Sequence, residues 1–293
     1  MSSTTPRIGI IGIGAMGFAM ATHLQDRGHA PAVRDIDPAA ESAARARGLH
    51  VCDSPAELAA RCELVALVVV DAAQIDSVLF GDGGIVHAAQ RPAVMICSTI
   101  GAGDTERFRD RLAEHGIALL DAPISGGPVR AAAGTMSMML ACEQALFDRF
   151  GPLLREMAGT LFYVGAKVGD AARTKLVNNL LAGINLVAGA EALALGARLG
   201  LDKRALFEVI KASSGASWIV TDRMARALEG DYVPRARSVI LTKDVGLAVQ
   251  MADAAGVDTP LGDAALALFK ATVAAGFGEL DDAAVIKSIC PDF

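Results

Sequence analysis

The sequence predicts an α/β domain with a mostly parallel sheet over residues 1–166 and an all-α domain over residues 167–293. Three observations lead to this prediction. Short apolar runs alternate with helical segments in the first half, a glycine-rich motif joins the first run to the first helix, and no convincing strand pattern follows residue 168. A chain of 293 residues is long enough to give each domain its own core.

The first half contains apolar, β-branched runs separated by helix-like segments. The expected strands are RIGIIGIG (7–14), APAVRD (30–35), LVALVVV (64–70), AVMICST (93–99) and ALLDAP (118–123). The first two helices, AMGFAMATHLQDRG (15–28) and PAAESAARARG (38–48), each end at a glycine. Strands that alternate with helices at this spacing form a parallel sheet covered by the helices.

The second half consists of helical patterns separated by breaks. The pattern changes after TLFYVG (160–165), and breaks follow at Gly200, SSGAS (213–217), GDYVP (230–234) and AGVDTP (255–260). The first of these helices, TKLVNNLLAGINLVAGAEALALGARLG (174–200), is rich in Ala and Gly. Small side chains allow helices to pack closely, so we expect this helix at the interface of a homodimer or homotetramer.

The composition argues against several classes of protein. A hydrophobic content of 53% excludes a disordered chain, and a net charge of −6 without a basic patch argues against nucleic-acid binding. No apolar run reaches the ~18 uninterrupted residues that a membrane span needs. The five histidines and five cysteines lack the spacing of metal ligands, so no metal is expected. An odd number of cysteines without a CxxC pair favours a reducing, cytoplasmic location.

Gly12, Gly14 and Gly17 form the pattern GxGxxG between the first strand and the first helix. In a Rossmann domain the first glycine permits a tight turn, the second lets a pyrophosphate approach the backbone, and the third lets helix and strand pack closely. The helix N-terminus then directs its positive dipole end at the phosphates. Because the glycines have this explanation, we do not interpret MSSTTPR and the apolar run that follows as a signal peptide.

Asp35 closes the second predicted strand, eighteen residues after Gly17. A carboxylate at this position can accept hydrogen bonds from the ribose hydroxyls of NAD and would repel the 2′-phosphate of NADP. The next residue is Ile36, where NADP enzymes often have arginine, and strand alternation should turn Arg34 to the other face. We therefore expect NAD as the cofactor.

The segment KLVNN (175–179) places polar side chains at the head of an apolar helix. Lys175, Asn178 and Asn179 have the spacing i, i+3, i+4 and share one helix face, whereas Arg173 lies about 200° away from Lys175. The last 178 residues contain no histidine, so Lys175 is the best-placed acid/base there. A desolvated lysine can titrate near neutrality and an arginine cannot. The alternative is a lysine that extends to solvent beside partly solvated asparagines.

Four motifs occur in an order that is typical of one family. They are IGIIGIGAMGFAMATHLQDRGH (8–29), DAPISGGPVRAAAGTM (121–136), GDAARTKLVNNLLAGIN (169–185) and LTKDVGLA (241–248). Together they resemble the β-hydroxyacid dehydrogenases, a family that includes 3-hydroxyisobutyrate dehydrogenase. The resemblance spans essentially the whole chain. It implies an N-terminal Rossmann domain, a helical C-terminal domain and a site between them.

The resemblance also implies roles for individual residues. Lys175 matches the catalytic lysine of the family, and Thr99 and Lys243 match positions that contact the cofactor near the nicotinamide. The predicted substrate-binding residues are Ser125, Gly126, Gly127, Asn178 and Asn179. The predicted cofactor contacts are Gly12, Ile13, Gly14, Ala15, Met16, Gly17, Asp35, Val70, Thr99 and Lys243.

One position departs from the family pattern. Many members have an aromatic residue where this chain has Ala236, in YVPRARSVILTKD (232–244). This difference leaves the wall of the substrate pocket, and with it the substrate, undetermined. ASWIVTDR (216–223) and GDYVPRA (230–236) are more similar to the branch of the family that contains L-threonate dehydrogenase.

These observations predict NAD-dependent oxidation of a small 3-hydroxy acid, or the reverse reduction, with Lys175 as general acid/base. The expected substrate resembles 3-hydroxyisobutyrate or a short sugar acid such as L-threonate. Two alternatives stay open from the sequence. An imine reductase shares the architecture, although such enzymes usually lack the lysine, and a non-catalytic NAD-sensing module would bind NAD without turnover.

Overall fold

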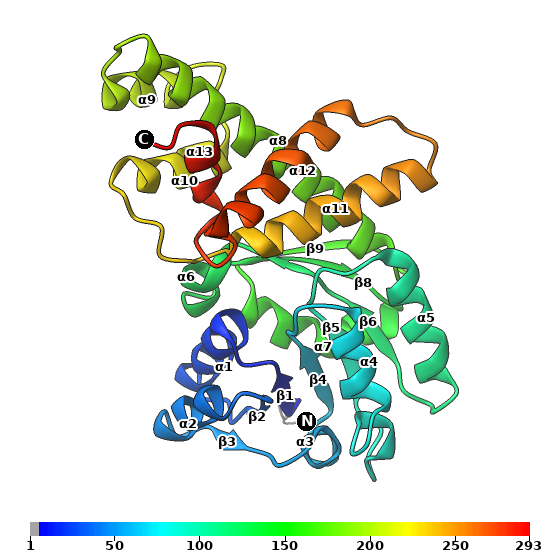
Figure 1. The fold of residues 1–293 in the computed structure, drawn as a ribbon. Helices are drawn as coiled ribbons and strands as arrows, with labels where there is room; N and C mark the ends of the chain where they lie inside the picture. Colours follow the sequence, from blue (N-terminus) through cyan, green and yellow to red (C-terminus); the bar gives the residue numbers. More distant parts are fainter. Residues whose placement is uncertain (1–5) are drawn as a thin grey trace. The chain divides into compact units, whose positions relative to one another are not determined.

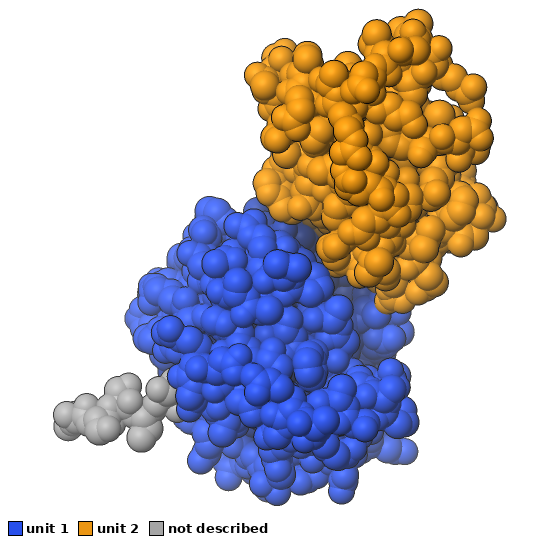
Figure 2. Space-filling model, turned by 90° about the vertical axis from the view of Figure 1, so that its left-hand side faces the viewer, with its two compact units in different colours: residues 1–175 blue, residues 176–293 orange. Residues whose placement is uncertain are grey.

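The chain forms two compact units, residues 1–175 and residues 176–293 (Figure 2). The computed structural model describes residues 6–293, so the first five residues of the signal-like start lie outside it. The first unit extends beyond the predicted boundary at residue 166 and includes the first turns of the long helix α8 (Asp170–Arg198). The backbone of Gly169, Ala171 and Ala172 is hydrogen-bonded to the side chain of Asp121 within this unit.

The first unit is built on a nine-stranded sheet, counted over the described residues (Figure 1). Its strands are β1 (Ile8–Ile11), β2 (Ala32–Arg34), β3 (His50–Val51), β4 (Leu64–Leu67), β5 (Ala93–Ile96), β6 (Leu119–Asp121), β7 (Ile124–Ser125), β8 (Ser137–Ala141) and β9 (Thr160–Gly165). The order is β3-β2-β1-β4-β5-β6-β8-β7, with β9 paired to β8. The first six strands are parallel, which confirms the predicted mostly parallel sheet.

The strand β8 is the exception to the parallel arrangement. It runs antiparallel to β6 and β7 and parallel to β9. The five strands expected from the sequence do not include β3, β7, β8 or β9. Strands β3 and β7 have two residues each, which is too short for a recognisable alternation. After Ser137, β8 is apolar throughout and has no periodicity to separate a strand from a buried helix.

Helices cover both faces of this sheet and enclose two apolar cores. The helices of the first unit are α1 (Ala15–Asp26), α2 (Pro38–Ala46), α3 (Pro55–Arg61), α4 (Ala72–Phe80), η1 (Ile85–His87), α5 (Ala102–Ala113), α6 (Gly127–Ala132) and α7 (Gln144–Met157). Helices α1, α2, α6 and α7 pack on one face, while α3, α4 and α5 pack on the other. Because β1, β4 and β5 contribute to both cores, these strands are apolar throughout.

The second unit is helical, as the sequence predicts. Its elements are the greater part of α8, α9 (Lys203–Lys211), α10 (Trp218–Leu228), α11 (Ser238–Ala254), α12 (Pro260–Thr272), η2 (Val273–Phe277), η3 (Asp282–Ala284) and α13 (Val285–Ile289). Their core includes Leu186, Leu193, Met224, Val245 and Phe269. Gly183 and Gly189 of α8 lie against Val245 and Val220, so glycine permits this close packing.

Helix α8 is long and apolar enough to cross a membrane by length and composition alone. It has 29 residues, and 44% of its most apolar window, of mean hydropathy 1.7, is buried in the structure. A core helix of a globular unit meets the same criteria. The buried side of α8 supplies Leu186, Val187, Ala190 and Leu193 to the core of the second unit.

Candidate active site

The glycine-rich turn after β1 has the geometry that a dinucleotide requires. Gly12 has φ +90°, and a Cβ at Gly17 would lie 1.9 Å from the carbonyl oxygen of Gly12. A Cβ at Gly14, in contrast, would meet no atom within 4 Å. Gly14 is the N-cap of α1 and provides no side-chain cap for the first-turn N–H groups. The turn therefore combines tight packing with an open approach to uncapped N–H donors, which fits a pyrophosphate.

The remaining predicted residues of this turn differ in exposure. Ile13 is buried and packs in the core, Met16 is half-buried, and Ala15 is exposed beside Gly14. An apolar contact at position 13 anchors the turn, while the backbone at positions 14 and 15 faces outward. Of the predicted cofactor contacts in this turn, Gly14 and Ala15 are exposed, and they lie at the N-terminus of α1.

Asp35 follows β2 and is hydrogen-bonded to the same turn. Its Oδ2 accepts the N–H of Ile13 at 2.6 Å, and its Oδ1 accepts the N–H of Asp37 at 2.9 Å. The carboxylate is thus fixed beside the glycines, because β1 and β2 are neighbouring parallel strands whose carboxyl ends meet at one edge. The guanidinium of Arg34 is paired with the carboxylate of Glu41 in α2.

Val70 and Thr99 follow the next two strands, β4 and β5, at the same edge of the sheet. Val70 is 37% exposed, and its N–H donates to Oε1 of Gln74 at 2.8 Å. Ser98, buried next to Thr99, accepts the N–H of Val69 through its hydroxyl oxygen at 3.1 Å. Ser98 therefore joins the two loops that carry the predicted contacts, although no sequence pattern singles it out.

The predicted substrate loop lies between β7 and α6. Gly126 and Gly127 have φ values of +128° and +73°, which L side chains rarely adopt. Ser125 ends β7, where its carbonyl oxygen is 3.4 Å from the donating hydroxyl of Ser137 in β8. The loop is therefore held by the antiparallel β7–β8 pairing, which the sequence did not predict.

Lys175 lies on α8 and is 6% exposed. This burial contradicts the alternative of a lysine that extends to solvent. Arg173, two residues earlier, has a different environment: its guanidinium pairs with Glu106 of α5 at 2.7 Å and with Asp170 at 2.9 Å. The helix thus directs the two cations to different surroundings, as the predicted 200° rotation requires.

The two asparagines of KLVNN differ from each other. Asn179 is 8% exposed, and its Nδ2 donates to Oδ2 of Asp244 in α11 at 2.8 Å. Asn178 is exposed, and its Nδ2 donates to Oδ1 of Asn179 at 3.2 Å. Lys243 is paired with the other carboxylate oxygen of Asp244 at 2.9 Å. In the second unit, Asp244 thus connects two residues of the predicted site, Asn179 and Lys243.

Asp244 follows Lys243 in the motif LTKDVGLA (241–248), and no role is predicted for it from the sequence. The signal that could have identified it is a carboxylate flanked by apolar residues one turn away on both sides within a helix, since such a group requires a buried partner. The structure supplies that partner as the amide of Asn179.

The segment that contains Ala236 is held by a buried ion cluster. Asp281 and Asp282 are 0% and 2% exposed and pair with Arg226 and Arg223 of α10. Oδ2 of Asp281 accepts the N–H of Ala236 at 3.3 Å, and the N–H of Asp282 donates to the Ala236 carbonyl at 2.8 Å. The backbone at the atypical position is therefore fixed from both sides.

A cluster of possible metal ligands lies near β3. Donor atoms of His50, Cys52 and Glu57 lie within 4.8 Å of one another. Both oxygens of Glu57 already accept hydrogen bonds, from the N–H of Asp53 at 2.8 Å and from Arg61 at 3.3 Å. Burial raises the pKa of the Cys52 thiol to about 11, which disfavours the thiolate that binds metal. We assign these contacts to the start of α3, and the absence of a metal stays a prediction.

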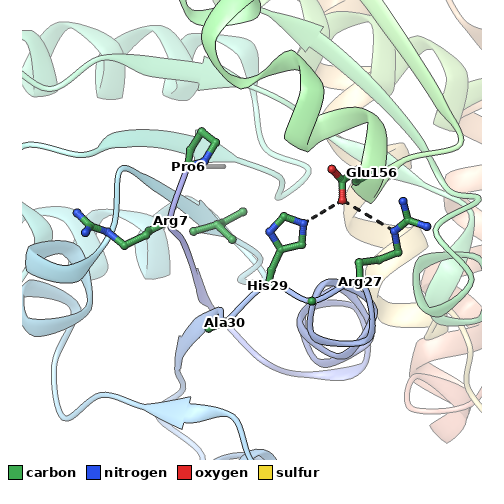
Figure 3. Close-up of a pocket in the computed structure, with 8 residues that line it drawn as sticks. Pro6, Arg7, Arg27, His29, Ala30 and Glu156 are labelled. Atoms are coloured by element: carbon green, nitrogen blue, oxygen red, sulfur yellow. Dashed lines mark hydrogen bonds and ion pairs between the residues drawn. The ribbon is translucent and has the colours of Figure 1, made fainter. Parts of the chain in front are cut away.

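A cavity of about 400 Å³ lies at the amino end of β1 (Figure 3). Figure 3 shows Glu156 of α7 between His29, at 2.9 Å, and Arg27, at 3.8 Å. Ligands of parallel sheets bind at the carboxyl ends of the strands, where the glycine-rich turn lies. The cavity is at the opposite end of β1, and the contacts of Glu156 with Arg27 and His29 join α7 to the end of α1 and the residues after it.

Comparison with known proteins agrees with this geometry. The model of the NAD binding domain of 6-phosphogluconate dehydrogenase matches residues 7–165, and the NAD-binding model of NADP-dependent 3-hydroxyisobutyrate dehydrogenase matches residues 169–289. L-threonate dehydrogenase of Cupriavidus necator is 41% identical over 281 residues, which cover 96% of this chain and 95% of the relative. The chain belongs to the β-hydroxyacid dehydrogenase family.

Two further relatives support the assignment of this chain to the β-hydroxyacid dehydrogenase family. L-threonate dehydrogenase of Pectobacterium atrosepticum is 37% identical and covers 96% of this chain and 93% of its own. The crystal structure of 3-hydroxyisobutyrate dehydrogenase from Salmonella typhimurium has a TM-score of 0.88 at 35% identity, with 96% and 99% of the two chains covered. The protein is an NAD-dependent hydroxyacid dehydrogenase, and its cofactor is a nicotinamide dinucleotide.

Proposed function

We propose that this dehydrogenase oxidises a short hydroxylated carboxylic acid of the L-threonate type, with Lys175 as its general acid/base. The observation that carries the proposal is the burial of Lys175 on α8, one helical turn before the buried Asn179. The relatives named L-threonate dehydrogenase support the sugar-acid substrate. 3-Hydroxyisobutyrate is the alternative substrate, since the Salmonella typhimurium structure that this chain resembles is named for that activity.

The proposed chemistry divides the reaction between cofactor and protein. The bound nicotinamide ring supplies the hydride acceptor. Nζ of Lys175, as the neutral amine, accepts the proton of the substrate hydroxyl while the carbon loses its hydride, so that the alcohol becomes a carbonyl and the lysine becomes an ammonium. Ser125, the N–H groups of Gly126 and Gly127, and the amides of Asn178 and Asn179 hold the carboxylate and the hydroxyl.

Substitution of Lys175 tests this mechanism. Lys175→Ala should lower kcat by about 10²–10⁴-fold, the usual contribution of a positioned acid/base, with NAD binding retained. Lys175→Arg should be similarly inactive, because arginine keeps the charge but cannot deprotonate. Thr174→Ala, an exposed neighbour on the same helix, is the control. Wild-type turnover in Lys175→Ala would refute the mechanism and favour a binding module without catalysis.

A panel of substrates identifies the reaction. NAD⁺ reduction should be fastest with L-threonate among L-threonate, 3-hydroxyisobutyrate, D-glycerate, L-serine and 4-hydroxybutyrate. NMR of the product identifies the oxidised carbon, because L-threonate has hydroxyl groups at more than one position. Oxidation at C3 would confirm the predicted 3-hydroxy chemistry, and oxidation at C2 would contradict it.

We infer that the dehydrogenase prefers NAD over NADP. The Asp35 carboxylate is fixed beside the glycine-rich turn, and Arg34 is paired with Glu41, a residue that also accepts from Arg45 at 3.1 Å. The double variant Asp35→Ser/Glu41→Gln should shift the NAD⁺/NADP⁺ ratio of kcat/KM by on the order of 100-fold toward NADP⁺, since a like-charge repulsion is lost. Glu63→Gln, a surface carboxylate paired with Arg149, is the control. NADP⁺ preference in the wild type would refute the inference.

We also infer a cytoplasmic homodimer or homotetramer assembled through α8. Val177, Leu181 and Leu195 are 59%, 59% and 61% exposed and lie on one face of this helix, which a second copy of the chain would cover. The five cysteines are free and buried, in agreement with a reducing compartment. Light scattering should give at least a dimer for the wild type and a smaller species for Leu195→Arg. A monomeric wild type would exclude this assembly.

A further inference from the structure

Asp121 is a buried carboxylate that the proposed chemistry does not use. It is the last residue of β6 and is 1% exposed. Its Oδ2 accepts three backbone N–H groups: Gly169 at 2.8 Å, Ala171 at 3.1 Å and Ala172 at 3.1 Å. Gly169 directly precedes α8, and Ala171 and Ala172 lie in its first turn, where N–H groups have no partner within the helix.

The three hydrogen bonds determine where α8 begins relative to the sheet. A carboxylate at a helix N-terminus interacts favourably with the helix dipole, and one oxygen that accepts three donors leaves little freedom to shift the helix. Gly169, at φ +101°, allows the chain to turn into this arrangement. Burying the Asp121 carboxylate costs desolvation free energy, and the three hydrogen bonds that it accepts offset part of that cost.

The state of the carboxylate is consistent with this geometry. Burial raises the pKa of Asp121 to about 6, although the N–H groups of Ala172, Gly169 and Ala171 act to lower it. Above this value the group is ionised and acts only as an acceptor. At the alkaline pH used to assay alcohol oxidation, both oxygens are therefore available to backbone donors.

Lys175 follows Ala172 by three residues and Ala171 by four, so it lies on the helix face directly above the anchored turn. Asp121 also precedes the loop that carries Ser125 by only four residues. Ala122 is itself tied to β5, where its N–H donates to the carbonyl of Ile96 at 2.9 Å. One short segment of chain therefore holds both the start of α8 and the predicted substrate loop.

We propose that Asp121 is the positioning residue for Lys175: by anchoring the first turn of α8 to the end of β6, it holds the lysine in register with the Ser125–Gly127 loop. This inference rests on the proposed acid/base role of Lys175. Asp121 itself exchanges no proton with substrate. Its effect is on the placement of Nζ, and a displacement near 1 Å is enough to cost about 100-fold in rate.

Kinetics of Asp121 variants at pH 8 test the proposal. Asp121→Ala should lower kcat by about 100-fold while the KM for NAD⁺ changes by less than about 3-fold. Asp121→Asn keeps one oxygen acceptor and should lose on the order of 10-fold, so the conservative variant gives partial rescue. The matched control is Asp202→Ala, which removes the N-cap that accepts the N–H of Ala205 at 2.7 Å in α9 and should leave kcat unchanged.

A double-mutant cycle separates positioning from general destabilisation. If Asp121 acts through Lys175, adding Asp121→Ala to Lys175→Ala should lower the residual rate by less than about 3-fold. An equal loss in both backgrounds, or a folded Asp121→Ala with kcat within about 3-fold of the wild type, overturns the proposal. If Asp121→Ala does not fold, the same criteria apply to Asp121→Asn, with its expected loss on the order of 10-fold.

The outcomes also separate this inference from the proposed function. Wild-type turnover in Lys175→Ala would refute the acid/base role, and Asp121 would then have no lysine to position. An inactive Lys175→Ala together with a fully active Asp121→Ala would refute only the positioning role.

Discussion

At the scale of single residues, Asn178 and Asn179 show how much one step along a helix changes. Each residue rotates the side chain by about 100°. Asn179 is buried and donates to the Asp244 carboxylate, whereas Asn178 is exposed and its hydrogen bond is to Asn179. The sequence analysis predicts both asparagines on one helix face with Lys175. That face extends from the buried interior at Asn179 to the exposed surface at Asn178.

Substitution of the two asparagines should therefore have unequal effects on stability. Asn179→Ala leaves the buried Asp244 carboxylate without its amide donor and should lower the free energy of unfolding by about 1.5–3 kcal/mol. Asn178→Ala should change it by less than about 0.5 kcal/mol, as for most exposed positions. Urea denaturation of both variants measures the difference. Equal destabilisation would show that the contact to Asp244 contributes little.

At the scale of elements, two glycines of the β1–α1 connection, Gly14 and Gly17, have different structural surroundings although they belong to the same motif. Gly17 is needed because the helix backbone lies against Gly12, while the space at Gly14 is open. The first requirement concerns folding and the second concerns the ligand. The GxGxxG pattern alone does not distinguish a glycine required for folding from one required for ligand binding, whereas the structure does.

Gly17→Ala should lower the Tm by several degrees, because the new Cβ would overlap the Gly12 carbonyl oxygen and the helix must move. Gly14→Ala should keep the wild-type Tm without ligand and should weaken NAD⁺ binding, because its Cβ occupies the approach to the backbone. Thermal melts with and without NAD⁺ measure both effects. Comparable Tm loss in the two variants would contradict this division.

The sequence predicts the local features of this fold well and the long-range features poorly. The glycine-rich turn, Asp35 and the parallel strands depend on neighbours in sequence, so patterns indicate them. Strand β8 pairs with segments elsewhere in the chain, and the partners of Asn179 and of the start of α8 lie 48 or more residues away, as Asp121 does from Gly169. No local pattern specifies such a pairing, because many carboxylates could supply it.

At the scale of the whole molecule, buried acids in both units link stability to pH. Burial raises the pKa of Asp121 to about 6 and that of Asp282 to about 7, from an ordinary value of 3.8. Between pH 4 and 7, about the range these shifts span, the folded chain binds more protons than the unfolded chain. Its free energy of unfolding therefore decreases as the pH rises through this range.

Other carboxyl groups act in the opposite direction. The pKa values of Asp281, Glu63 and Asp231 are lowered, the first despite burial, through hydrogen bonds and arginine neighbours. Their stabilisation is lost as the pH falls through those lowered values, below about 4. Together the two sets predict a stability maximum on the acid side of neutrality.

Calorimetry from pH 4.5 to 8.5 should record a Tm that increases on acidification from about pH 8 to about pH 5. Asp121→Asn, which cannot titrate, should show a smaller increase, and Asp110→Asn on the exposed surface of α5 should keep the wild-type slope. A wild-type Tm that falls steadily from pH 8 to pH 5 would contradict this assignment.

The ion cluster around Asp281 and Asp282 has a consequence for how this enzyme could diverge. Because carboxylates and arginines hold the backbone at Ala236, the side chain at that position has little part in maintaining the loop. Evolution, or a protein engineer, can therefore exchange the residue there without rebuilding its support. The backbone at this position keeps its shape whatever side chain it carries, so Ala236, which the family resemblance associates with the pocket wall, is the position at which a directed library should begin.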